Sequence, residues 1–368
     1  MTQRILTPNG HYRELDEALR DLGVTRLLLV CDGAWEHLDI RHWAEELRDV
    51  TVTFFRDFQP NPRYESVAAG VRCFREADAQ AIFAAGGGSA MDVAKCIKLF
   101  CRMDAGRNYL DQPIVPNDVP LIAMPTTAGT GSEATRYAVI YRDGEKQSVT
   151  HDSIVPSVVL MDPSALRMLP PYQRKATMLD ALCHAVESCW SVHSTDESRT
   201  YAREAISLVT AHMPGYLANA EEGNAGMLRA ANTAGKAINI TQTTAGHAMC
   251  YKLTSLYGLA HGHAAALCNR ALFPWMLAHP ERCTDPRGPE HLQAALRDIA
   301  SAMSCEAPEQ AADKLDRLVR DLGLSVPSPA PEDFDTLVRS VNPVRLKNFP
   351  MRLGEDDITA LYHRILRA

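Results

Sequence analysis

The first half of the chain alternates short apolar runs with amphipathic segments, and this alternation constrains the fold more than any other feature. Four apolar runs have the length and composition of buried strands: 26–31, 52–55, 81–85 and 119–124. Helical periodicity appears around and between these runs, over 11–22, 64–77 and 91–101. Strand followed by helix, repeated, predicts a parallel sheet with helices on both faces.

After about residue 165 the apolar spacing becomes helical throughout. The predicted helices cover 173–191, 197–213, 225–239, 264–278, 289–303 and 309–322. A chain of 368 residues has room for about two domains. We therefore predict an α/β dinucleotide-binding domain over 1–165 and an all-helical domain over 166–368, with the functional site in the cleft between them.

Composition excludes several classes of protein. The chain has 38 Lys and Arg against 45 Asp and Glu, a net charge of −7, which argues against a nucleic-acid coat or a basic membrane surface. Its apolar runs are far shorter than the roughly 20 residues that span a bilayer, and its first residues lack the apolar stretch of a secretory signal. The ten cysteines include no CxxC pair, so we interpret them as free thiols. We expect a cytoplasmic protein with no nucleic-acid or membrane partner.

Two glycine-rich turns follow predicted strands. The first, in Ala85-Gly-Gly-Gly-Ser-Ala-Met-Asp-Val-Ala-Lys95, leads into a helix, and the second is Pro125-Thr-Thr-Ala-Gly-Thr-Gly-Ser-Glu133. Glycines let backbone amides approach a ligand closely, and a helix N-terminus favours a phosphate. The first turn fits neither the Walker A spacing nor GxGxxG. Each turn alone could be a tight turn, but two at the ends of two strands favour a nucleotide site.

Potential metal ligands lie in the helical half. Asp180 and His184 are four residues apart, which places both side chains on one face of a helix. His247 and His261 follow in apolar surroundings, whereas His263 should point elsewhere on its helix. One carboxylate with three imidazoles suits iron(II) or zinc. The alternative is a helix cap and packed histidines, and spacing alone does not show that the four side chains converge.

Four segments in this order resemble the iron-dependent (group III) alcohol dehydrogenase family: GGGSAMDVAK, PTTAGTGSEAT, LDALCHAVES and AGHAM…LYGLAHGHA. The resemblance covers nearly the whole chain. It implies a Rossmann-like α/β N-terminal domain and an all-α C-terminal domain, the dehydroquinate synthase-like fold. It also implies NADH as cofactor, with NADPH as the alternative, and Fe²⁺ or Zn²⁺. We further expect a homodimer acting on a small aldehyde or alcohol.

The resemblance assigns roles residue by residue. It implies four metal ligands: Asp180, His184, His247 and His261. It implies cofactor contacts from the two turns and from one later residue: Gly87, Gly88, Ser89, Asp92, Thr126, Thr127 and Lys146. Asp32, after the first strand, matches the position that faces the adenosine ribose. A carboxylate there favours NADH over NADPH, although Asp32 could instead cap the following helix.

One departure from the family pattern is informative. Many members carry a second histidine four residues after the third ligand, where this chain has Tyr251, followed by Lys252. Together with the segment 341–352, this makes the chain similar to the branch that reduces phosphonoacetaldehyde to 2-hydroxyethylphosphonate in phosphonate natural-product pathways. We interpret Lys252 as an anion anchor rather than a solvated lysine. Arg345, Lys347 and Arg352 could also reach a phosphonate, although a charged C-terminal segment is usually solvated.

The predicted reaction is metal-assisted hydride transfer from a nicotinamide to an aldehyde. The proton comes from Tyr251 or from a water relay through the ribose hydroxyls. Within the same fold, the alternatives are a general group III or glycerol-type dehydrogenase and a dehydroquinate-synthase-like lyase. From another class, the alternative is a non-catalytic sensor that binds NAD and a metal.

Overall fold

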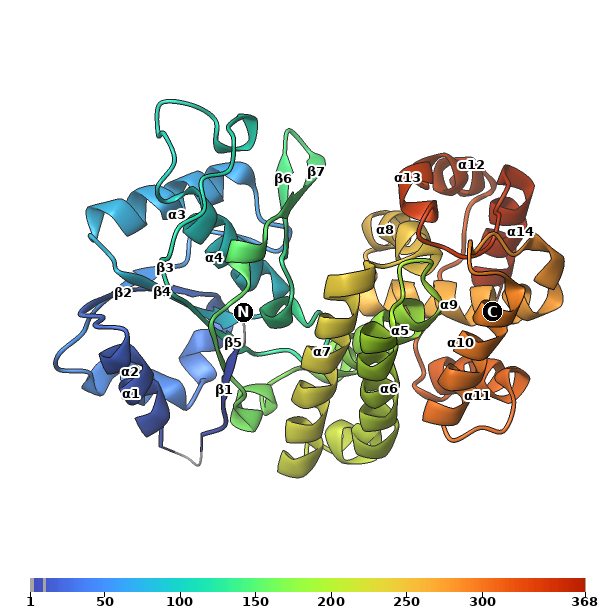
Figure 1. Cartoon of the computed structure of the whole chain (residues 1–368), viewed down its shortest axis with the longest axis horizontal. Coiled ribbons are helices and arrows are strands. Elements are labelled where there is room, and N and C mark those ends of the chain that lie inside the picture. The colour runs from blue at the N-terminus through green and yellow to red at the C-terminus, as the bar shows by residue number, and fades with distance from the viewer. Residues whose placement is uncertain (1–2, 9–10, 368) are drawn as a thin grey trace. The chain divides into compact units, whose positions relative to one another are not determined.

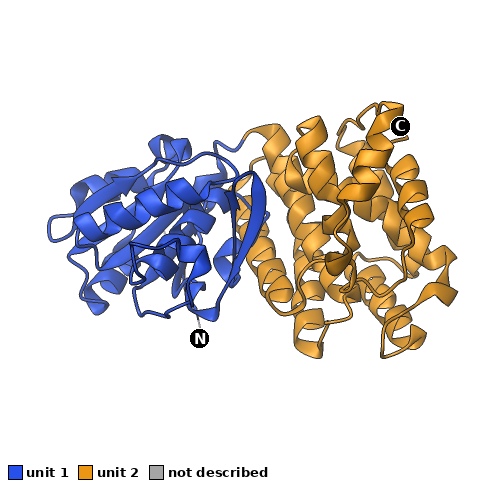
Figure 2. Ribbon diagram, turned by 90° about the horizontal axis from the view of Figure 1, so that it is seen from above, with its two compact units in different colours: residues 1–169 blue, residues 170–368 orange. Residues whose placement is uncertain are grey.

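A computed structural model describes residues 3–8 and 11–367. The chain divides into two compact units, Met1–Leu169 and Pro170–Ala368 (Figure 2). The division falls at the first of two consecutive prolines, four residues after the predicted boundary. Proline fixes its own backbone and suits the first turn of a helix, so the second unit opens directly into a helix.

A parallel sheet forms the centre of the first unit (Figure 1). In the described ranges it has six strands in the order β1-β8-β5-β4-β2-β3, each paired in parallel with its neighbours. The strands in chain order are β1 (Arg4–Leu6), β2 (Arg26–Cys31), β3 (Thr51–Phe55), β4 (Ala81–Gly86), β5 (Leu121–Pro125) and β8 (Val158–Leu160). The four predicted strands all form, so the α/β interpretation of this half is confirmed.

Helices cover both faces of this sheet. They are α1 (Arg13–Asp21), α2 (Ile40–Glu46), α3 (Tyr64–Glu76) and α4 (Gly88–Phe100). Successive side chains of a strand point to opposite faces. Accordingly, Leu28 of β2 joins the core that contains α3 and α4, whereas Leu27 and Leu29 join the core that contains α1 and Trp43 of α2. This two-sided burial explains why β2 is a continuous apolar run.

A hairpin follows the sheet's fifth strand and was not predicted from the sequence. Strands β6 (Tyr137–Arg142) and β7 (Glu145–Thr150) pair antiparallel around Asp143 and Gly144, which have φ of 54° and 80°. Asp-Gly is a preferred dipeptide for a two-residue turn with both φ values positive. The hairpin carries Lys146, one of the expected cofactor contacts.

The second unit is helical. Its helices are α5 (Pro171–Trp190), α6 (Asp196–Leu217), α7 (Glu221–Thr241), α8 (Ala245–Tyr257), α9 (His261–Ala278), α10 (Pro289–Ala302), α11 (Pro308–Asp321), α12 (Pro331–Ser340), α13 (Pro343–Leu346) and α14 (Glu355–Ile365). The six predicted helices are present, whereas α8, α12, α13 and α14 were not among the predicted ranges. Helix α5 packs against α6, α7 and α9, and every residue from Met178 to Trp190 is buried. A helix buried on all sides forms the centre of this unit.

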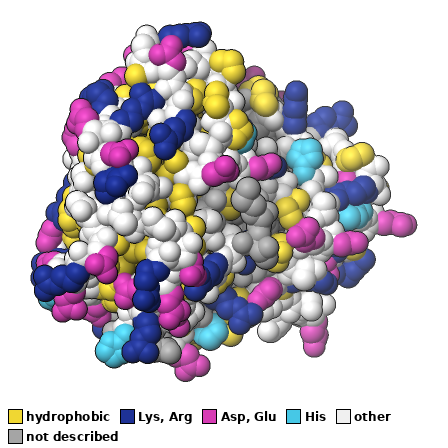
Figure 3. Space-filling model, turned by 60° about the vertical axis from the view of Figure 1, so that its left-hand side comes forward, with side chains coloured by type: hydrophobic (Ala, Val, Ile, Leu, Met, Phe, Trp, Pro, Cys, Tyr) yellow, Lys and Arg dark blue, Asp and Glu magenta, His cyan; other side chains and the backbone are white. Residues whose placement is uncertain are grey.

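The described surface agrees with the composition. On the face that Figure 3 displays, acidic and basic side chains are interspersed rather than separated by sign. In the described ranges, none of the helices combines the length and apolar character needed to cross a membrane.

Candidate metal centre and cofactor-binding turns

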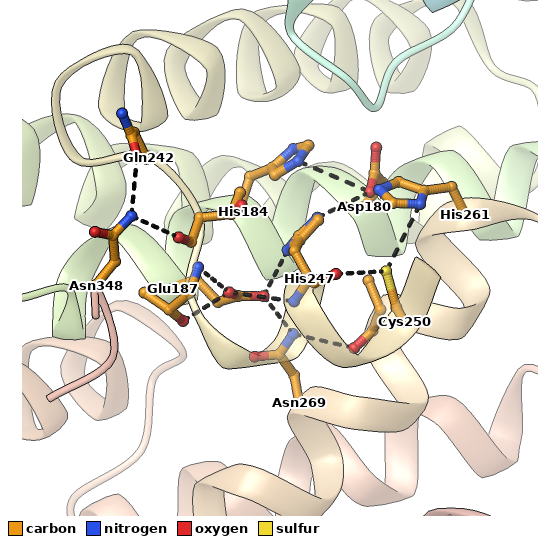
Figure 4. Close-up of polar contacts among 12 residues, drawn as sticks. Asp180, His184, Glu187, Gln242, His247, Cys250, His261, Asn269 and Asn348 are labelled. Carbon is orange, nitrogen blue, oxygen red and sulfur yellow. Dashed lines mark hydrogen bonds and ion pairs between the residues drawn. The ribbon is translucent and has the colours of Figure 1, made fainter. Parts of the chain in front are cut away.

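Three of the four expected metal ligands converge in the second unit (Figure 4). Asp180 of α5, His247 of α8 and His261, the first residue of α9, each offer a ligand atom, and these atoms all lie within 4.8 Å of one another. Asp180 and His247 are buried, and His261 is half-buried. The contacts of α9 with both α5 and α8 bring together residues up to 81 positions apart.

His184 lies beside this group without belonging to it. It follows Asp180 by one turn of α5, and its Nε2 is 3.9 Å from Oδ1 of Asp180. Its ring stacks on His247, with centroids 4.5 Å apart and planes inclined by 14°. The structure therefore shows a three-residue group and places the fourth expected ligand next to it.

Two buried atoms of the group indicate a cation. Oδ1 of Asp180 and Nε2 of His247 lie 3.5 Å apart, and neither has a hydrogen-bond partner in the described part of the chain. Burying unsatisfied polar atoms is costly. Burial alone would lower the pKa of His247, but Glu187 and Asp180 raise it to about 9. Two carboxylates thus favour positive charge here, and the mixed carboxylate–imidazole set fits iron(II) or zinc.

Glu187, which was not predicted from the sequence, contacts the nitrogen of His247 that does not face Asp180. It is fully buried on α5, and its Oε1 lies 2.6 Å from Nδ1 of His247. The backbone and hydroxyl of Thr244 each donate to Oε2 at 2.6 Å, and Asn269 donates to Oε1 at 2.8 Å. Burial alone would raise the pKa of Glu187, but His247 and these hydrogen bonds hold it at about 2. An ionised Glu187 accepts the Nδ1 proton and leaves Nε2 of His247 for a metal.

Two glycines allow close packing of the helices around the metal group. A Cβ on Gly246 would lie 2.3 Å from Nδ2 of Asn269 and 2.4 Å from Oε1 of Glu187. A Cβ on Gly262 would lie 2.1 Å from the carbonyl oxygen of Ala176 on α5. Each of these glycines adjoins a histidine of the metal group. Their missing side chains let α8 and α9 contact the residues of α5.

Tyr251 links the metal group to the C-terminal part of the unit. Its ring stacks on His261 at 5.5 Å, and its hydroxyl accepts a hydrogen bond from Nη1 of Arg345 at 2.8 Å. Burial raises the pKa of Tyr251 and outweighs the opposing charge of Arg345, so the phenol is protonated at neutral pH. Lys252, the next residue, is half-buried and pairs with no acidic side chain in the described part of α8 and its surroundings.

In the first unit, the two glycine-rich turns contact each other at the ends of β4 and β5. The backbone N–H of Thr126 donates to the carbonyl of Gly86 at 3.1 Å. A Cβ on Gly87 would lie 3.4 Å from Thr127, and a Cβ on Gly88 would lie 3.1 Å from Thr130. Helix α4 begins at Gly88, three residues before its predicted start. The expected cofactor contacts therefore include the N-terminus of α4, where a phosphate is favoured.

Two more expected cofactor residues, Asp32 and Asp92, lie near these turns. Asp32 caps a short helix by accepting from the backbone of Ala34 at 2.9 Å, while its other oxygen would lie 3.1 Å from a Cβ on Gly86. It thus caps the helix and also borders the first turn. Asp92 lies 3.4 Å from the hydroxyl of Ser132, and burial raises its pKa to about 7, against the opposing charges of Lys95 and Lys146.

Family models match both units of the chain. Residues 2–163 match "Iron-containing alcohol dehydrogenase" and residues 175–366 match "Fe-containing alcohol dehydrogenase family, C-terminal". The chain belongs to the iron-containing alcohol dehydrogenases. The predicted family and fold are thereby confirmed, and the protein is an oxidoreductase of the iron-containing alcohol dehydrogenase family.

Relatives of this iron-containing alcohol dehydrogenase act on different substrates. It is 32% identical to the phosphonoacetaldehyde reductase of Streptomyces viridochromogenes over 87% of this chain and 86% of that one. It is 28% identical to the NAD-dependent methanol dehydrogenase of Bacillus methanolicus over 86% and 84%. The structure of sulfoacetaldehyde reductase from Bifidobacterium kashiwanohense in complex with NAD⁺ matches with a TM-score of 0.88 and 27% identity, over 99% and 97% of the chains.

Proposed function

We propose that this protein reduces phosphonoacetaldehyde to 2-hydroxyethylphosphonate with NADH and a divalent metal. Asp180, His184, His247 and His261 are the proposed metal ligands. The observation that carries the reductase chemistry is the buried group of one carboxylate and two imidazoles, with unsatisfied atoms facing each other. Nε2 of His184 lies 3.9 Å from Oδ1 of Asp180, and this closeness supports His184 as the proposed fourth ligand.

A bound Fe²⁺ or Zn²⁺ supplies Lewis acidity toward the aldehyde oxygen. The chain's own residues do the rest. Glu187 fixes the proton on Nδ1 of His247 and so orients that imidazole. The protonated phenol of Tyr251 is the proposed proton donor to the reduced oxygen, directly or through water and the ribose hydroxyls.

The glycine-rich turns are the proposed cofactor site. Backbone amides of Gly87, Gly88 and Ser89 at the start of α4 suit the pyrophosphate of NADH. Asp32 accepts from the adenosine ribose, and Thr126 and Thr127 complete the second turn. Asp92 and Lys146 are proposed to contact the nicotinamide half, and their mutual attraction supports placing them together.

The proposed substrate is supported by the negative charge that it shares with another relative's substrate. Phosphonoacetaldehyde and sulfoacetaldehyde, named in two relatives, are both aldehydes with a strongly acidic group. A buried anion needs a cationic partner, and Lys252 is the proposed anchor. The second candidate is a general alcohol dehydrogenase, which the similarity to a methanol dehydrogenase favours.

NADH oxidation by the metal-loaded protein distinguishes these candidates. The aldehyde panel is phosphonoacetaldehyde, sulfoacetaldehyde, propanal and glyceraldehyde. We expect kcat/KM for phosphonoacetaldehyde to exceed that for propanal at least tenfold. Equal kcat/KM values for propanal and phosphonoacetaldehyde would favour the general dehydrogenase. If NADH is not oxidised with any of the aldehydes, the proposed reaction is contradicted. The proposed homodimer is tested separately by sedimentation.

A further inference from the structure

Arg345 of α13 is held against Tyr251 of α8. Its Nη1 donates to the phenol oxygen at 2.8 Å, and its guanidinium carbon lies 4.8 Å from the centre of the ring. Helices α13 and α8 are in contact. The guanidinium therefore makes two contacts with Tyr251, a hydrogen bond to the hydroxyl and a cation–π contact with the ring. Together they hold Arg345 in place against Tyr251.

The segment that carries Arg345 is itself fastened near the metal group. Nδ2 of Asn348 donates to Oε1 of Gln242 at 3.0 Å and to the carbonyl of Thr243 at 3.2 Å (Figure 4). The carbonyl of Asn348 accepts from the backbone of Val192 at 3.0 Å. Asn348 is buried, so this charged segment is anchored and not simply solvated.

Arg345 is half-buried but has no carboxylate partner in the described ranges. Other partly buried arginines of the same unit do have one, since Arg199 pairs with Asp298 and Arg282 pairs with Asp357. A guanidinium has five N–H donors, and the bond to Tyr251 uses one of them. Arg345 therefore keeps donors and a whole positive charge for an anion.

The position of this charge relates it to the proposed reaction. Tyr251 stacks on His261 at 5.5 Å, so Arg345 is two direct contacts away from a proposed metal ligand. In a substrate with a two-carbon chain, the acidic group can lie only a short distance from the aldehyde. A planar guanidinium matches two oxygens of a phosphonate or sulfonate, and a lysine acts as a point charge.

We propose that Arg345 binds the anionic head group of the substrate and so determines specificity, with Tyr251 as the residue that positions it. The inference rests on the proposed function. It adds a residue that recognises the substrate and that lies 94 positions after Tyr251 in the chain. Lys252, which follows Tyr251 on α8, contributes the second positive charge.

The test compares Arg345→Gln with the matched variant Lys347→Gln. Lys347 is exposed at the end of the same helix, so its substitution removes an equal charge from the same segment. Glutamine keeps an amide donor for Tyr251 but loses the charge. For Arg345→Gln we expect KM for phosphonoacetaldehyde to rise at least tenfold, whereas KM for propanal, which has no anionic group, should change much less. Lys347→Gln should leave both substrates within twofold.

Calorimetric titration with methylphosphonate supplies a readout that does not depend on turnover. We expect its Kd to rise at least tenfold in Arg345→Gln and to stay within twofold in Lys347→Gln. If Arg345→Gln proves unfolded by circular dichroism, Arg345→Lys takes its place, because it keeps the charge and loses the planar fork. For Arg345→Lys we expect a rise in both KM and Kd that lies between the wild-type values and the tenfold rise expected for Arg345→Gln.

The outcomes separate this inference from the proposed function. A wild-type enzyme that does not prefer phosphonoacetaldehyde to propanal contradicts the proposed substrate. A wild-type preference that survives in Arg345→Gln, with Kd unchanged, contradicts the role of Arg345 alone. Equal losses on both aldehydes, or equal effects of the Arg345 and Lys347 substitutions, would also overturn that role.

Discussion

Oε1 of Glu187 lies 2.6 Å from Nδ1 of His247, and both side chains are buried. A carboxylate only accepts hydrogen bonds, so this contact decides which nitrogen of the imidazole carries the proton. The remaining nitrogen faces Oδ1 of Asp180 at 3.5 Å. The geometry is the carboxylate–histidine arrangement that supports metal ligands in proteins generally.

Glu187→Gln should weaken metal binding without abolishing it. The amide keeps the shape of the side chain, but its NH₂ group is a donor where the carboxylate had an acceptor. It would face other donors, namely those of Thr244, Asn269 and His247. Loss of such a supporting partner typically weakens metal affinity by roughly 10–100-fold. Competition titration with a chelator measures the metal affinity, and circular dichroism verifies the fold. An affinity equal to the wild type would show that Glu187 does not support the metal.

His247→Ala should lose both bound metal and turnover, while His263→Ala keeps the metal. His247 belongs to the converging group, whereas Nδ1 of His263 lies 3.1 Å from the hydroxyl of Tyr172. Removing a ligand opens the coordination sphere, whereas His263 lies outside the converging group and packs against Tyr172. Metal content by mass spectrometry distinguishes the two variants. A His247→Ala protein with full metal and wild-type rate would refute the proposed site.

Asp32→Gly should relax the preference for NADH over NADPH by about tenfold or more. A carboxylate accepts from the ribose hydroxyls and repels a 2′-phosphate. Asp32 also caps the following short helix, so Asp32→Asn is the matched variant: it keeps an acceptor for the N–H of Ala34 and removes the charge. If charge sets the preference, both variants shift the ratio of kcat/KM values. If only Asp32→Gly shifts it, the cap and not the charge is responsible.

The sequence predicted those parts of the site whose residues are close together in the chain. Asp180 and His184 share a helical face because they are four apart, and both lie on α5. Glu187 follows Asp180 by seven residues, which is two helical turns on the same face, so the same spacing rule would have found it. The Asp143-Gly144 dipeptide likewise marked the missed hairpin.

Other features depend on contacts that no local pattern encodes. The bond between Arg345 and Tyr251 joins residues 94 positions apart. Strands β1 and β8 have three residues each, too few to show a period. They form because β1 pairs with β8 and β8 pairs with β5. Helix α4 begins at Gly88 because the chain turns directly out of β4, which the helix-like spacing from residue 91 onward did not reveal.

Asp285→Asn should destabilise the second unit at neutral pH and much less in acid. Asp285 is buried, and Arg287 donates to both of its oxygens at 2.9 and 2.7 Å. Burial alone would raise the pKa of Asp285, but the hydrogen bonds from Arg287 hold it below its ordinary value. The folded state therefore binds this proton less readily than the unfolded state. The stabilisation is present above about pH 4 and is lost as the pH falls further.

We expect Asp285→Asn to lower the free energy of unfolding by about 1–3 kcal/mol at pH 7. Thermal unfolding from pH 7 to pH 3 should show the gap between wild type and variant narrowing below about pH 4. Asp313→Asn, at an exposed position of α11, is the control and should change the unfolding temperature little at any pH. A gap that stays constant with pH would mean that the charge of Asp285 does not contribute.

Lys252→Ala should lower kcat/KM for phosphonoacetaldehyde at least tenfold and change the value for propanal little. The lysine is half-buried on α8, five residues after the proposed ligand His247, and it pairs with no acidic side chain in the described part of the chain. Loss of a buried charged partner typically costs about 2–5 kcal/mol, and each ~1.4 kcal/mol is tenfold in kcat/KM. Lys252→Arg keeps the positive charge and should retain most of the activity. Equal losses on the anionic and the neutral aldehyde would assign Lys252 a structural role, and recognition of the acidic group would then depend on Arg345.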